Sequence, residues 1–151
     1  MATQEVGLNW KLIEEQTPRT YAVIFDTGDE ALSGLEHFAA ETGVAASHFT
    51  AVGGFSQATL GYFDVEARKY LHIPIDEQVE VLSLVGDITL DGSDRKVHGH
   101  VVVGKRDGAA MGGHLLEAHV RPTLEVIVVE APVPLQRHHD PATGLALISV
   151  G

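Results

Sequence analysis

The 151-residue chain contains no cysteine, which excludes disulfide bonds and every metal or redox site that uses thiolates. Its longest apolar runs, residues 101–103 and 126–129, are far shorter than the ~18 residues that a membrane-spanning helix needs. The first residues, MATQEVGLNWKLIEEQ, lack the basic segment and the apolar segment of a secretory signal. We therefore expect a cytoplasmic protein that does not associate with membranes.

Basic residues are also scarce, since 10 Lys and Arg stand against 21 Asp and Glu, for a formal charge of −11. This balance disfavours a broad attraction to nucleic acids or anionic membranes. It leaves room for a local basic patch, for which the dipeptides Arg95-Lys96 and Lys105-Arg106 are the candidates. The nucleotide-binding patterns GxGxxG and GxxxxGK[ST] and the hydrolase patterns GxSxG and HExxH are all absent.

The length and the hydrophobic pattern predict a single domain over residues 1–151, with its core at about 21–148. Residues 30–43 predict a helix, because apolar residues recur on one face and Gly43 follows the last turn. An Asp or Thr within residues 26–29 is expected to cap it. The remaining pattern predicts strands at 21–25, 48–52, 59–65, 78–90, 97–103, 115–120, 123–130 and 145–150. One helix and many closely spaced strands predict an α+β fold with a mainly antiparallel sheet.

Nine histidines are the unusual feature of the composition. His98 and His100 lie two residues apart on a predicted strand, so their imidazoles face the same side. His114 follows two glycines, 112 and 113, which are expected to form a sharp turn. Three imidazoles with an open fourth position are typical of catalytic zinc, whereas a solvated polar strand face explains the same residues without a metal. The other six histidines, including His72 and the pair 138–139 in predicted loops, are not expected to bind metal.

Three carboxylates are candidates for supporting roles. If residues 91–94 join their flanking strands directly, Asp87 lies opposite His98 and can accept the second N–H of its imidazole. A register slip of one residue would turn Asp87 to the other face. Glu117 and Glu125 are acid/base candidates beside a metal-bound water, and the alternative for both is an ordinary outward-facing polar residue.

Residues 80–130, with their LSLVGDI, HGH, GGHL and TLE segments, closely resemble the plants-and-prokaryotes-conserved (PPC) domain, and AVGGFSQATLGYFD before them fits as well. The resemblance implies an α+β fold, a homotrimer and a divalent metal, most readily zinc. It implies His98, His100 and His114 as the ligands. It also suggests a distant relation to acetolactate decarboxylase, which uses a three-histidine zinc site, although a shared fold does not fix function.

Two functions follow from these observations, and they predict different partners. The first is a trimeric metal-binding protein whose three-histidine site suits chemistry on a small carbonyl or carboxylate substrate, or metal sensing without catalysis. The alternative is a DNA-associated regulatory or scaffolding protein, since members of the resembled family are often labelled DNA-binding. The AT-hook core Arg-Gly-Arg-Pro of plant members is absent here. A third interpretation is a structural trimer with a vestigial site.

Overall fold

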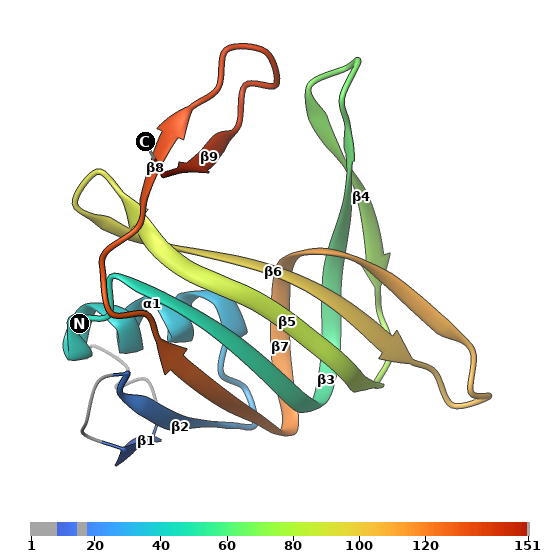
Figure 1. Ribbon diagram of the computed structural model, residues 1–151. Helices are drawn as coiled ribbons and strands as arrows, with labels where there is room; N and C mark the ends of the chain where they lie inside the picture. The colour runs from blue at the N-terminus through green and yellow to red at the C-terminus, as the bar shows by residue number, and fades with distance from the viewer. Residues whose placement is uncertain (1–8, 15–17, 151) are drawn as a thin grey trace, which may run out of the picture.

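The structure, a computed structural model, describes residues 9–14 and 18–150, so the expected domain of residues 1–151 extends beyond them at both ends. Within the described residues, one helix and nine strands form the fold (Figure 1). The elements are β1 (Asn9–Glu14), β2 (Thr20–Asp26), α1 (Ala31–Thr42), β3 (Ala46–Asp64), β4 (Lys69–Ile75), β5 (Val79–Asp91), β6 (Asp94–Gly104), β7 (Ala110–Glu130), β8 (Gln136–His139) and β9 (Ala146–Ser149). The α+β class with a mainly antiparallel sheet is confirmed.

Helix α1 begins and ends close to the predicted residues. Its N-cap is Glu30, whose carboxylate accepts a 2.7 Å hydrogen bond from the Ser33 amide, so the prediction of an Asp or Thr cap is wrong. Gly43 ends the helix with a φ of 75°, the left-handed conformation that glycine adopts without strain. Leu35 and Phe38 on its inner face are fully buried. No helix among the described residues is long and apolar enough to cross a membrane.

The four longest strands close a ring of antiparallel pairs. β3 pairs with β5, β5 with β6, β6 with β7, and β7 returns to β3. Buried and exposed residues alternate along β6, so this strand has an inner apolar face and an outer face that carries His98 and His100. The inner faces and α1, which packs against β6 and β7, share one apolar cluster. The histidines of β6 therefore lie outside the core.

Two strands, β3 and β7, are each longer than the sequence predicts. β3 runs through Gly53 and Gly54, where a break was expected, with only a register shift beside Gly53. A Cβ added at either glycine would lie 2.2 Å from the Thr123 carbonyl oxygen or 2.4 Å from that of Arg121. The two glycines therefore allow β7 to lie against β3, and they do not end the strand.

Three strands were not predicted. These are β1 and two strands that carry residues assigned to loops, β4 with His72 and β8 with His138 and His139. β4 pairs with the second half of β3, and β8 forms a hairpin with β9. This hairpin joins the sheet at a single parallel pair, Leu90 with Gln136, near the end of β5. The chain therefore folds back over the outer side of β5 after β7 ends.

Candidate metal centre

Three imidazoles converge where β6 and β7 run side by side. His98 and His100 project from the same face of β6, and His114 on β7 is the register partner of His100. The ring centroids are 4.9 to 5.5 Å apart. Each ring offers one nitrogen, and these nitrogens lie within 4.8 Å of one another. Among the described residues, no other group of three or more His, Asp or Glu side chains meets this condition.

Two of these rings approach each other head-on. Nε2 of His98 lies 3.2 Å from Nε2 of His100. Two unprotonated nitrogens at this distance repel each other, because each directs a lone pair at the other. An N–H···N hydrogen bond, with the proton on one of the two nitrogens, or a cation held between them removes that repulsion, so the spacing is compatible with a shared metal ion.

Asp87 lies beside the triad in the predicted register. The two-residue turn of Gly92 and Ser93 joins β5 to β6 directly, and Asp87 is consequently the cross-strand partner of His98. Its Oδ2 is 3.6 Å from Nδ1 of His98, an electrostatic contact that is too long for a hydrogen bond. The carboxylate therefore favours an orientation of the His98 ring in which Nε2 points to the other two histidines.

Arg137 on β8 fixes Asp87 from the opposite side, and sequence reasoning missed it. Its guanidinium donates to Oδ1 of Asp87 at 2.6 Å, to the hydroxyl of Thr89 at 2.8 Å and to the Ala146 carbonyl at 2.9 Å. The Arg137 side chain is almost completely buried. No sequence pattern marks it, since fifty residues separate it from Asp87. The C-terminal hairpin thus contributes a positioning residue to the triad.

The electrostatic environment favours the neutral form of His100 and His114, the form that can bind a cation. Burial, together with the neighbouring His98 and His100, lowers the pKa of His114 to about 4. Burial and His98 also lower the pKa of His100. Burial alone would raise the pKa of Asp87, but His98 and the Arg137 charge outweigh it and hold that pKa below its ordinary value. At neutral pH, His100 and His114 are neutral and Asp87 is charged.

The His114 ring is held firmly but lacks a polar partner. Tyr70 of β4 stacks on it, with centroids 4.6 Å apart and planes 27° apart. Nδ1 of His114 is buried and has no hydrogen-bond partner among the described residues. A buried polar atom of this kind costs free energy until a ligand satisfies the ring. Tyr70 was not anticipated, because β4 was not predicted as a strand.

The glycines before His114 act differently from the expectation. Gly112 and Gly113 lie within β7 and do not form a turn. A Cβ on Gly113 would lie 2.8 Å from the Gly61 carbonyl oxygen on β3. The absence of a side chain at this position therefore allows close approach of β3 to the segment that carries His114.

The other two predicted carboxylates do not join the triad. Glu117 is exposed, hydrogen-bonds His119 at 2.9 Å and borders a separate hollow of about 110 Å³. Glu125 is also exposed, and its register partners are Ile24 on β2 and Val52 on β3. Within this chain, neither carboxylate belongs to the group of convergent ligand atoms.

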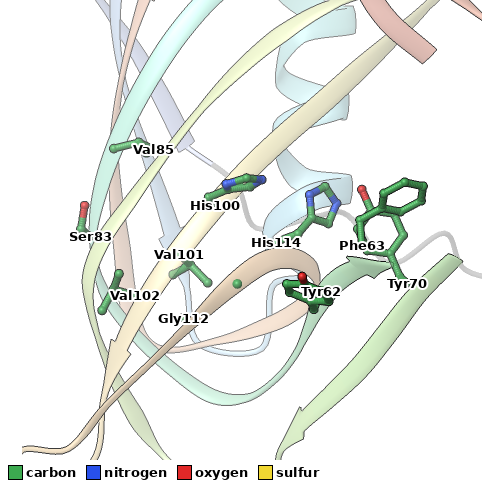
Figure 2. A pocket seen from close by; sticks show the side chains of 12 residues that line it. Tyr62, Phe63, Tyr70, Ser83, Val85, His100, Val101, Val102, Gly112 and His114 are labelled. Atoms are coloured by element: carbon green, nitrogen blue, oxygen red, sulfur yellow. The ribbon is translucent and has the colours of Figure 1, made fainter. Parts of the chain in front are cut away.

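Two cavities flank the triad. One, of about 390 Å³, is bordered by His100 and His114, and Figure 2 shows these two rings on one side of it. The other, of about 240 Å³, is bordered by His98 and His114 and by the C-terminal hairpin, including Arg137. His114 and Tyr70, which stacks on it, border both cavities.

The two basic dipeptides lie at separate hairpin ends and do not form one continuous basic patch. Arg95 donates from Nε to the Val44 carbonyl at 3.2 Å. Lys105 forms a 2.8 Å ion pair with Glu77. These contacts engage one basic side chain of each dipeptide within the chain itself.

Solved structures from other organisms share this fold. A metal-containing protein from Archaeoglobus fulgidus is 33% identical with a TM-score of 0.82, over 93% of this chain and 99% of that one. A plant- and prokaryote-conserved protein from Pyrococcus horikoshii is 28% identical with a TM-score of 0.82, over 99% and 98% of the two chains. A third, from Bacteroides thetaiotaomicron, is named only as a candidate DNA-binding protein, and is 25% identical with a TM-score of 0.85, over 93% and 96%.

No curated protein matches the chain. Residues 12–132 match the Plants and Prokaryotes Conserved domain, abbreviated PCC. The matched range includes all three histidines and Asp87 but ends before Arg137. This match covers most of the chain and agrees with the resemblance seen in the sequence. The chain therefore belongs to the Plants and Prokaryotes Conserved domain family.

Proposed function

We propose that this protein binds one divalent metal ion through His98, His100 and His114. The observation that carries the proposal is the convergence of three imidazole nitrogens within 4.8 Å. The 3.2 Å approach of Nε2 of His98 to Nε2 of His100 is compatible with one ion held by both nitrogens. The similar structure from Archaeoglobus fulgidus is that of a metal-containing protein, which gives the proposal independent support.

Zinc is the proposed ion. Zinc binds imidazole nitrogens at about 2.0–2.1 Å in a tetrahedral arrangement, in which two ligand nitrogens are about 3.3 Å apart. The 3.2 Å between the Nε2 atoms of His98 and His100 matches that spacing. The third nitrogen lies within 4.8 Å, a distance that rotation of a ring can shorten. Iron, nickel and copper also accept imidazole ligands, so measured metal content decides among them.

Three protein ligands leave a position for a small molecule, and we propose a carbonyl or carboxylate compound there. A bound divalent ion supplies Lewis-acid polarisation to an oxygen of such a compound. Asp87 orients His98, and Arg137 holds Asp87 in place. Tyr70 holds the His114 ring by stacking. These residues thus bind the metal ion and orient its ligands, and the proposal names no bond of the small molecule that breaks.

Metal analysis of purified protein tests the metal proposal. We expect close to one equivalent of metal by inductively coupled plasma mass spectrometry in wild type, and a large loss in His100→Ala. His72→Ala removes an exposed histidine of β4 and is the matched control that should keep its metal. Wild-type protein that does not retain or take up zinc would refute the proposal.

We also propose that the chain assembles as a homotrimer. The outer face of β2, β3 and β7 carries exposed apolar side chains at Ile24, Val52 and Ile127. Exposed apolar surface of this extent is typical of a protein–protein interface. Light scattering coupled to gel filtration should give three times the 16.2 kDa chain mass. A monomeric mass at micromolar concentration would contradict the assembly.

DNA association is the second candidate, and the name of the Bacteroides thetaiotaomicron structure is the observation that favours it. The charge of −11 and the pairing of Lys105 with Glu77 oppose it. The candidate predicts duplex binding that weakens steeply as salt rises. Fluorescence anisotropy with a labelled duplex at low ionic strength decides, and an absence of binding there removes this candidate.

A further inference from the structure

The 390 Å³ cavity next to His100 and His114 is lined almost entirely by uncharged side chains. None of its lining residues, all within the described part of the chain, is an Asp, Glu, Lys or Arg. This is unusual for a chain with 31 such residues. The cavity on the His98 side differs, because Lys96 and Arg137 border it. A ligand in the larger cavity thus meets an apolar wall and the triad, and no other charged group.

Aromatic side chains from both faces of the β3–β4 hairpin border this cavity. Tyr62 and Phe63 come from β3 and Tyr70 from β4, which are joined by a hairpin. Figure 2 shows Tyr62 across the cavity from Val102, with His114 next to Tyr70. Phe63 and Tyr70 pack edge to face, whereas Tyr62 is 65% exposed. The Tyr62 ring is therefore available to a flat ligand.

The dimensions suit a ligand with one ring. An apolar cavity of about 150 Å³ holds benzene, and this cavity has about 390 Å³. A six-membered ring with a short side chain and a polar head fits this space. Pockets of a few hundred cubic ångströms ordinarily hold small molecules with apolar bodies and few polar groups.

We propose that this cavity binds a small monocarboxylate with a flat, apolar body, such as an arylalkanoate. The carboxylate points to the triad and the ring lies between Tyr62 and Val102 of β6. The proposal rests on the proposed metal, because a divalent ion held by the three imidazoles attracts one anionic head. Attraction in a cavity with few polar groups is stronger than in open water.

The same wall composition excludes other ligand classes. A second charged group on the ligand would lose its hydration against Val85 and Val102 without gaining a partner, which is costly. A dicarboxylate or a phosphorylated sugar is therefore a poor ligand. Acetate can place its carboxylate at the triad but does not cover the exposed Tyr62 ring, so it should bind more weakly than a carboxylate that carries a ring.

Calorimetric titration with three probes tests the inference. Zinc-loaded and EDTA-treated wild-type protein are each titrated with phenylacetate, acetate and succinate. We expect phenylacetate to bind the zinc-loaded protein at least about tenfold more tightly than acetate or succinate, since its ring becomes buried. Binding to EDTA-treated protein should be at least about tenfold weaker, because the anionic head then has no cation.

Two variants identify the wall that binds the ring. Tyr62→Ala should weaken phenylacetate binding about tenfold and leave acetate binding and zinc content unchanged. Val133→Ala, at a residue that is 60% exposed and outside the cavity lining, is the matched control and should change neither affinity. The mass of each variant is measured by light scattering. Tyr62→Ala protein that dissociates but keeps its phenylacetate affinity would assign Tyr62 to assembly and overturn the inference.

The outcomes separate this inference from the proposed function. Zinc binding with equal affinities for phenylacetate and acetate overturns the inference and leaves the metal site intact. Tight zinc binding with a preference for succinate also overturns it. Failure of wild type to bind zinc refutes the proposed function itself, and it overturns the inference at the same time because the anionic head then lacks its partner.

Discussion

Replacement of Arg137 with methionine removes the charge that holds Asp87 while keeping most of the side-chain volume. In the native protein the guanidinium contacts the Asp87 carboxylate, the Thr89 hydroxyl and the Ala146 carbonyl. The Arg137 side chain is 5% exposed, and that of Asp87 is 30% exposed. Arg137→Met therefore leaves a half-buried carboxylate and a buried hydroxyl without their donor, and it loosens the C-terminal hairpin.

The expected loss of stability follows from these exposures. Removal of one partner from a fully buried ion pair costs about 3–5 kcal/mol. Because water reaches Asp87, we reduce that figure to about 1 kcal/mol for the lost carboxylate interaction. The buried Thr89 hydroxyl adds about 1–2 kcal/mol. The total of about 2–3 kcal/mol corresponds to a fall in Tm of about 4–12 °C for a domain of this size.

Urea unfolding of metal-free protein, followed by far-UV circular dichroism, measures this loss without a contribution from bound zinc. A double-mutant cycle with Asp87→Asn should give a coupling free energy of at least about 1 kcal/mol. Arg106→Met, at an exposed arginine, is the control and should change stability by less than about 0.5 kcal/mol. A loss of stability in Arg137→Met no larger than in the control, or additive effects in the cycle, would refute the reasoning.

Three further predictions concern Asp87, Gly113 and Glu30. The pKa of Asp87 is held below its ordinary value, so its stabilising contribution is present above about pH 4 and lost as pH falls; the stability difference between wild type and Arg137→Met should shrink between about pH 5 and pH 3 in urea titrations. Gly113→Ala places a Cβ 2.8 Å from a carbonyl oxygen and should cost about 1–3 kcal/mol in thermal denaturation, and an unchanged Tm would contradict this. Glu30→Ala removes the acceptor of two backbone amides and should cost about 1–2 kcal/mol; equal stability of this variant in urea would argue against the cap.

Local patterns were enough to predict the helix and the geometry of one hairpin. The apolar face of residues 31–42 and the glycine that follows depend only on neighbours in the sequence. The position of Asp87 opposite His98 follows from a turn of two residues, since a short turn fixes the register of both strands. The alternation of strand side chains likewise places His98 and His100 on one face.

Other features depend on contacts between distant segments, which no local pattern records. Arg137 reaches Asp87 only because the β8–β9 hairpin folds back onto β5, and Tyr70 stacks on His114 only because β4 pairs with β3. The glycines of β7 were assigned to a turn because glycine favours turns as much as close strand contacts. Gly61, the residue whose close approach explains Gly113, lies about fifty residues earlier in the chain.

The closed ring of β3, β5, β6 and β7 has a consequence for how a metal would enter and leave. His100 and His114 stand on backbone that is paired on both sides and His98 on backbone paired with β5, so the ligands keep their places whether or not an ion is present. Zinc fingers, by contrast, unfold when they lose their ion. Here an ion can exchange at a folded surface. The identity of the bound metal in the cell would then follow the supply of free ions and the preference of imidazole ligands, and would not be fixed once at folding.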